Sequence, residues 1–157
     1  MSRITAFILT FLISMLPIVE LRGAIPAAAV KFDLTFLEAY PVAVLGNVVP
    51  VPFIILYFKY LFKFFEKVKF IGTVFKKVHD KAVKNADKIE KYAVWGLFIF
   101  VAIPFPGTGA WTGAVIASVL EMRLRKAFPV ILMGVMTSGL IMGCVSYGLI
   151  DLITSLI

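Results

Sequence analysis

Four predominantly apolar stretches of this chain reach or approach the length of about 20 residues that spans the hydrocarbon core of a membrane. They are residues 4–19, 34–57, 93–120 and 127–157. The chain is 61% hydrophobic, whereas a soluble domain is about half apolar. Its 157 residues predict one domain. We therefore expect a single all-α integral membrane domain over residues 1–157.

The first apolar stretch has a second interpretation, a secretory signal peptide, because Arg3 precedes it. The stretch continues into Pro17, Glu20 and Arg22 without a clear small-residue cleavage motif. We expect it to belong to the membrane domain.

Residues 58–92 carry most of the positive charge. Ten lysines in this segment stand against four acidic residues, so it carries ten minus four, or +6, in a chain of net charge +7. The positive-inside rule places such a segment in the cytoplasm. Apolar residues recur there at steps of three and four, which predicts a basic amphipathic helix that binds anionic lipid headgroups.

Two other interpretations of residues 58–92 remain open. The segment can be a cytoplasmic linker that only fixes the topology of the chain. It can also be read as a nucleic-acid patch, but no nucleic-acid-binding motif accompanies it, so we expect no nucleic-acid partner.

The apolar stretch 93–120 is interrupted by AIPFPGTGAWTG at residues 102–113, where prolines and glycines disfavour a continuous helix. A second basic cluster follows at residues 123–126. If the stretch crossed the membrane, this cluster would lie on the side opposite to the lysine-rich segment, which the positive-inside rule disfavours. We therefore predict a re-entrant helical hairpin over residues 93–121. A proline-kinked spanning helix is the alternative.

A similar interruption, LPIVELRGAIPAAAV, occupies residues 16–30. We predict an architecture of two inverted repeats, each a re-entrant hairpin followed by a transmembrane helix, an arrangement of many secondary transporters. A monomer with only two full spans has little protein with which to bury the polar tips of its hairpins, so we also expect a homodimer. The predicted segments are a first hairpin at 1–31, a transmembrane helix at 34–57, the basic cytoplasmic segment at 58–92, a second hairpin at 93–121 and a transmembrane helix at 127–157.

Glu20 and Arg22 lie at the first interruption, inside the membrane in this topology. Ionisable groups at such depth usually face the protein interior or a wet cavity. On a regular helix the two side chains would point to different faces, whereas a broken backbone lets them converge. Our hypothesis is that Glu20 moves protons and that Arg22, with its planar guanidinium, binds a phosphate or carboxylate. A purely structural clamp for backbone groups is the alternative.

At the second interruption, backbone N–H groups rather than charged side chains are available to bind a ligand. Gly107, Thr108 and Gly109 can expose N–H groups at a helix N-terminus, which attracts anions. Trp111 either stacks on substrate or anchors at a membrane interface.

Residues elsewhere can contribute to the same site. Asn47 either caps a backbone group freed by Pro50 or reaches into the site. Arg123 and Arg125 either reach the site from the cytoplasmic rim or act only as topology signals. The complete set of expected substrate- and proton-binding residues is Glu20, Arg22, Gly23, Pro26, Asn47, Pro104, Pro106, Gly107, Thr108, Gly109, Trp111, Thr112, Gly113, Arg123 and Arg125.

The sequence lacks the residue patterns that are typical of metal and cofactor sites. His79 sits in the lysine-rich segment without a second ligand at metal spacing, and Cys144 has apolar neighbours. No phosphate-binding loop or nucleophile–base pattern is present. We predict no metal site, no cofactor and no enzymatic activity.

The motifs ELRGAIP at residues 20–26 and PFPGTGAWTG at residues 104–113 resemble the small multi-drug export protein family. That family is similar in predicted topology to the DedA/VTT membrane proteins. The resemblance implies lipid movement, of the polyprenyl-phosphate type, with a dependence on protons. DedA proteins tend to place arginines within or just after the second hairpin, whereas Arg123 and Arg125 follow it here by about ten residues.

The sequence thus predicts a small transporter in the cytoplasmic membrane, with an amphiphilic or anionic lipid-like substrate and possible proton coupling. Efflux of lipophilic drugs is the second interpretation, although an arginine beside the break favours an anion over a cation. A third is a non-transporting scaffold or tether that acts through the lysine-rich segment.

Tags at Lys84 and Arg125 test the predicted topology. We expect both tags to face the cytoplasm, because the chain turns back within residues 93–121 instead of crossing. Protease or label accessibility in right-side-out and inverted vesicles measures this, and tags on opposite sides would contradict the re-entrant hairpin.

Overall fold

The computed structural model describes residues 2–65 and 86–156, which form helices joined by short turns, without a strand among them. The all-helical class predicted from the sequence is confirmed. The helices are α1 (Arg3–Met15), α2 (Glu20–Lys31), α3 (Phe36–Val48), α4 (Pro50–Phe65), α6 (Ala86–Ala102), α7 (Ala110–Val119) and α8 (Leu124–Leu156).

Prolines and glycines set the two turns at which the chain reverses. The α1–α2 turn, residues 16–19, contains Pro17, and α2 then begins at Glu20 with a left-handed φ of 51°. The α6–α7 turn, residues 103–109, contains two prolines and the glycines Gly107 and Gly109 at φ 89° and 125°. Glycine adopts these positive φ values without the steric cost that a Cβ brings.

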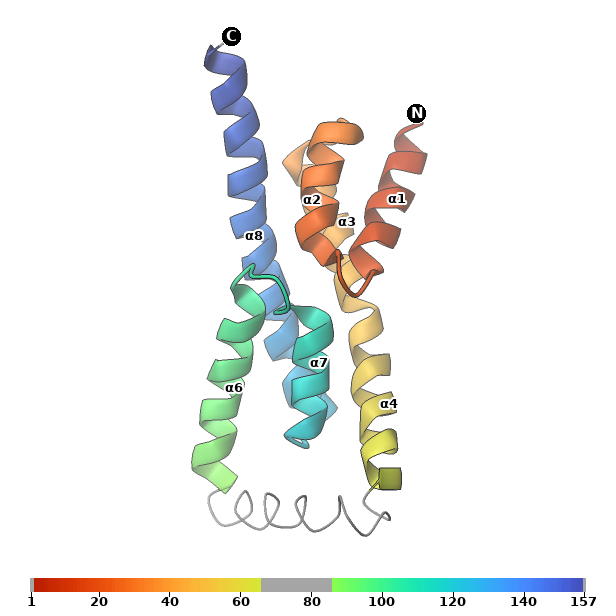
Figure 1. Ribbon diagram of the computed structural model, residues 1–157, viewed down its shortest axis with the longest axis vertical. Coiled ribbons are helices and arrows are strands. Elements are labelled where there is room, and N and C mark those ends of the chain that lie inside the picture. Colours follow the sequence, from red (N-terminus) through yellow and green to blue (C-terminus); the bar gives the residue numbers. More distant parts are fainter. Residues whose placement is uncertain (1, 66–85, 157) are drawn as a thin grey trace.

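The two helix pairs point at each other from opposite ends of the molecule. In Figure 1, α1 and α2 occupy the upper half and α6 and α7 the lower half, and their turns meet near mid-height. Helix α8 and the α3–α4 pair run past both halves. Both chain ends lie at the top, whereas the α7–α8 turn and the described residues that flank 66–85 lie at the bottom.

Two helical stretches are long and apolar enough to cross a membrane, Phe36–Phe58 and Leu124–Gly148. The first includes the break at Val49, where α3 gives way to α4 because Pro50 and Pro52 have no N–H to donate. The shorter apolar helices are Arg3–Met15, Tyr92–Ala102 and Ala110–Val119. The two long helices agree in number with the two transmembrane helices expected from the sequence.

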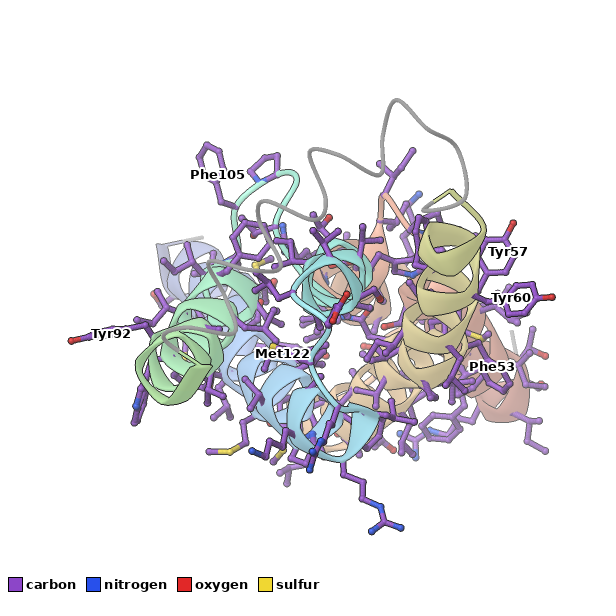
Figure 2. All side chains as sticks on the ribbon, turned by 90° about the horizontal axis from the view of Figure 1, so that it is seen from below. Phe53, Tyr57, Tyr60, Tyr92, Phe105 and Met122 are labelled. Atoms are coloured by element: carbon purple, nitrogen blue, oxygen red, sulfur yellow. The ribbon has the colours of Figure 1, made fainter. Side chains whose placement is uncertain are left out.

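Apolar side chains cover the outside of the bundle, and polar side chains lie within it. Exposed apolar residues form stripes along the helices, such as Ile4, Ile8 and Leu12 on α1. The aromatic side chains of Phe53, Tyr57, Tyr60, Tyr92 and Phe105 point away from the helices (Figure 2). The buried polar residues are Thr10, Ser14, Glu20, Asn47, Ser118 and Ser138. Apolar surface of this extent suits lipid rather than water as the surrounding solvent.

Glycines on α8 let it approach α3 closely. A Cβ on Gly139 would lie 2.8 Å from Cε2 of Tyr40, and one on Gly143 would overlap the ring of Phe36. The Tyr40 hydroxyl donates to the Met136 carbonyl at 3.1 Å, and the Tyr147 hydroxyl donates to the Leu34 carbonyl at 2.7 Å. At both glycines the space that a Cβ would need is occupied by an aromatic ring of α3.

The predicted basic amphipathic helix falls mostly outside the described residues. Helix α4 continues through Phe58 to Phe65, and α6 begins at Ala86. Residues 66–85, with most of the lysines, are not described.

We predict that Gly143→Ala destabilises the protein, because its methyl group meets the Phe36 ring. The expected cost is about 1–3 kcal/mol, typical of overpacking, and it appears as a lower melting temperature in detergent. Gly148→Ala, on the same helix with nothing within 4 Å of its Cβ, is the matched control and should not lower the melting temperature, because alanine is the better helix former.

Candidate functional site

The turns of the two helix pairs are joined by a set of hydrogen bonds that we call the tip clamp. It consists of the side chains of Glu20, Arg22, Thr108 and Trp111 with the backbone groups they bind. Each side chain of this set reaches from one turn to the other. The clamp lies where the turns meet in Figure 1.

Glu20 caps the N-terminus of α7. The residue is 3% exposed, and its carboxylate accepts a hydrogen bond from the Trp111 backbone N–H at 3.2 Å. The first N–H groups of a helix lack intrahelical acceptors and attract negative charge. The anion-binding N-terminus expected after Gly109 therefore exists, and a carboxylate of the same chain occupies it.

Arg22 binds the α6–α7 turn. Its guanidinium donates to the backbone carbonyls of Phe105 and Thr108 and, at 2.9 Å, to the Thr108 hydroxyl. The Thr108 hydroxyl also accepts a hydrogen bond from the Phe105 N–H at 3.3 Å. A planar guanidinium suits this set of acceptors, because its donors point in fixed and different directions.

Trp111 provides a contact from α7 back to the end of α1. Its indole Nε1–H donates to the carbonyl of Met15, the last residue of α1, at 3.1 Å. Glu20 thus satisfies the start of α7, and Trp111 satisfies the end of α1. Neither predicted role of Trp111, stacking on substrate or anchoring at a membrane interface, describes this contact.

The charged side chains of Glu20 and Arg22 converge, as the sequence analysis expected for a broken backbone. Oε2 of Glu20 lies 3.6 Å from Nη2 of Arg22, although the residues are only two positions apart. The left-handed φ of Glu20 turns its side chain out of the regular helical path. Arg22 is partly exposed, with 15% of its side chain accessible, so one edge of the clamp faces outward.

Gly109 is the residue against which this pair packs. A Cβ at Gly109 would overlap Oε2 of Glu20 and lie 2.6 Å from Nη2 of Arg22. Its φ of 125° would also strain any other residue. At Gly107, by contrast, a Cβ would meet nothing within 4 Å, so the outer edge of this turn is open.

Several predicted site residues lie outside the clamp. Gly23 and Pro26 are within α2 instead of the turn, and Gly113 packs against Val101. Pro104 is half-buried in the α6–α7 turn, while Pro106 and Thr112 are exposed.

Arg123 and Arg125 lie beyond the opposite end of α7 from the clamp. A ten-residue helix separates them from it, a length of about 15 Å. The structure does not bring them to the clamp, whereas their role as topology signals fits their exposure.

Asn47 is fully buried near the end of α3, and neither its Oδ1 nor its Nδ2 has a hydrogen-bond partner in the described part of the chain. The interpretation that Asn47 caps a backbone group freed by Pro50 is therefore wrong. Its alternative role in the site stays a prediction.

The backbone partners of the clamp could not be predicted from the sequence. They are the carbonyls of Met15 and Phe105 and the N–H of Trp111, and backbone groups leave no signal in residue identity. Ser14, whose hydroxyl donates to the Ala43 carbonyl at 2.5 Å and ties α1 to α3, was also missed. A serine within an apolar helix was its one available signal.

The described residues, 2–65 and 86–156, contain no group of three or more His, Cys, Asp or Glu side chains placed to hold a metal ion. The polar groups of the tip clamp are one carboxylate, one guanidinium, a hydroxyl, an indole and backbone groups.

Comparison with known protein families matches residues 20–141 to the family described as "Putative small multi-drug export protein". The match begins at Glu20, includes both turns' polar residues and covers more than half of the chain. The chain belongs to this family. Its description is that of an export protein, a type of transporter, and the two apolar helices long enough to cross a membrane agree with that description. No curated protein and no solved structure matches the chain.

Membership of the small multi-drug export family makes the clamp the first place to test. We predict that Arg22→Lys lowers the melting temperature, because one ammonium cannot reach the Phe105 and Thr108 carbonyls together. Loss of a hydrogen bond from a charged donor costs about 1.5–3 kcal/mol. Arg125→Lys, at an exposed position away from the clamp, is the control; equal melting temperatures for the two variants would contradict the clamp.

Proposed function

We propose that this protein is a small membrane transporter in which two re-entrant hairpins meet at the tip clamp and move an anionic, amphiphilic lipid of the polyprenyl-phosphate type, coupled to protons. The observation that carries the proposal is the clamp itself. Two opposite charges, Glu20 and Arg22, are held between non-helical turns about midway along the molecule. Charges at membrane depth are costly and mark pathways for ions or substrates.

The proposed architecture is an inverted repeat. Helices α1–α2 and α6–α7 approach from opposite ends, and each pair is followed by a longer span. Transporters built this way bind substrate near the midplane, where broken helices meet. The sidedness rests on charge: the lysine-rich segment and residues 123–126 face the cytoplasm in this proposal.

The chemistry of the clamp favours an anion as substrate. Arg22 and the N-terminus of α7 both attract negative charge, and the carboxylate of Glu20 already satisfies them. A phosphate headgroup would compete with Glu20 for both partners. Protonation of Glu20 would remove its charge and favour that exchange, so proton binding and substrate binding become linked.

In this proposal the substrate reaches the clamp from the surrounding lipid. Phe105 is exposed and points outward, and the adjoining Gly107 has open space beside it. A headgroup could therefore reach Arg22 from the side while its acyl or prenyl chain stays in the membrane.

Efflux of lipophilic drugs is the second candidate, and the family description supports it. A cationic drug would need the Glu20 carboxylate, which already accepts the Trp111 N–H and faces Arg22. A homodimer would add cover to the exposed turns, and the lysine-rich segment would bind anionic headgroups.

The transport proposal is tested in proteoliposomes of purified protein. We expect movement of a fluorescent long-chain alkyl phosphate between leaflets, measured by quenching from outside, and no movement of ethidium. Transport of ethidium alone would support drug efflux, and movement of neither would favour the non-transporting scaffold.

The proton link is tested with Glu20→Gln, which keeps the size of the side chain and its acceptor oxygen. We expect flux of the alkyl phosphate to respond to a pH gradient in the wild type and to lose that response in the variant. Glu121→Gln, an exposed position at the far end of α7, is the control. An unchanged gradient response in well-folded Glu20→Gln protein would remove the proton role.

A further inference from the structure

Two polar side chains in the core have no partner in the part of the chain that the structure describes. Asn47 on α3 is 0% exposed, and both its Oδ1 and its Nδ2 are unbonded. Ser138 on α8 is 2% exposed, and its Oγ is unbonded. Burying an amide or hydroxyl without a hydrogen bond costs on the order of 1–3 kcal/mol in proteins. Buried polar groups therefore usually have a hydrogen-bond partner, either in the protein or in bound water.

The two groups lie on helices that pack against each other. Gly139, next to Ser138, is the position where α8 meets Tyr40 and Val44 of α3, with Cγ2 of Val44 3.6 Å from where a Cβ would be. Asn47 follows Val44 by three residues, almost one helical turn. The register of this helix pair therefore puts Asn47 and Ser138 at neighbouring levels.

This level is also that of the tip clamp. Gly46, adjacent to Asn47, is the point where α3 contacts Phe11 and Ser14 near the end of α1. The carbonyl of Met15, one residue further, is the group that Trp111 binds. The unbonded groups thus stand in the layer where the two turns meet.

Helix breaks add further acceptors beside Asn47. Pro50 and Pro52 have no N–H, so they cannot donate to the carbonyls of Gly46 and Val48 as helical residues would. The end of α3 therefore combines an amide with carbonyls that lack their usual donors.

The pattern of unbonded atoms selects the ligand. A cation would satisfy Oδ1 of Asn47 and leave Nδ2 unbonded, and an anion would do the reverse. A water molecule both donates and accepts, and buried waters typically make about three hydrogen bonds. We infer that water is bound between α3 and α8, next to the tip clamp, with Asn47 and Ser138 as its side-chain ligands. This inference needs only the fold and holds whether or not the chain transports a lipid.

Hydroxyl-radical footprinting by X-ray pulses tests the inference on the purified full-length protein, because bound water yields radicals in place and these label adjacent side chains. The probes are Val44 and Val135, both buried within about one turn of Asn47 or Ser138. Ile55, fully buried about two turns from Asn47, is the control. With rates normalised to the free amino acids, we expect the valines to be labelled at least about five-fold faster than Ile55 if water fills the site.

Asn47→Leu provides the second measurement. With the amide gone, labelling of Val44 should fall to the rate of Ile55, and the melting temperature should not rise. Valines labelled no faster than Ile55 would overturn the inference, as would a variant that melts higher than the wild type because a dry, unbonded amide was removed. If the variant fails to fold, the wild-type comparison of Val44 and Val135 with Ile55 decides the question.

Discussion

The structure depends on the exchange of hydrogen bonds between two turns that have no helix of their own to satisfy them. Within a membrane, a free N–H or carbonyl has no water to bind, so irregular backbone is tolerated only where protein or a wet cavity covers it. Glu20 supplies an acceptor for an N–H in the first turn of α7, Arg22 supplies donors for the α6–α7 turn, and Trp111 supplies a donor for the end of α1. Each turn is stable because the other is present.

In the proposed function this dependence would join stability to transport. The groups that satisfy the backbone are of the kinds that bind an anion and a proton, so the structural clamp and the proposed substrate site would be one set of residues. The alternatives drawn from the sequence, a clamp or a transport site, need not exclude each other. In that proposal, a substrate that takes over the hydrogen bonds of Glu20 would part the turns while their polar groups stay bonded.

The helical class, the two long apolar helices and the places where the chain turns were predictable because apolar length and proline have direct physical consequences for a helix. The chain reverses at Pro17 and at Pro104–Gly107, as the interruptions indicated, and α8 begins within three residues of the predicted span. Pro26 and Gly23 were harder to place, since membrane helices accommodate such residues within a helix, and α2 runs through both.

The site was predictable in its charges and not in its partners. Glu20 and Arg22 were conspicuous as ions in apolar sequence, but the groups they bind are backbone atoms more than eighty residues away. Capping of a backbone group freed by Pro50 was one of two roles open to Asn47, and tertiary packing instead leaves its amide without a partner in the described part of the chain. Spacing along a chain predicts local bonds, whereas burial at a junction of several helices depends on contacts that one-dimensional order does not contain.

The hydroxyl of Thr108 has a consequence for how the α6–α7 turn can change shape. Its oxygen lies 2.8 Å from both the Ile103 and the Phe105 carbonyls, yet a single hydrogen can be given to only one of them at a time. The turn therefore possesses two arrangements of equal bond number that differ by a rotation about one C–O bond. A change from one arrangement to the other redirects this donor while the number of hydrogen bonds in the turn stays the same.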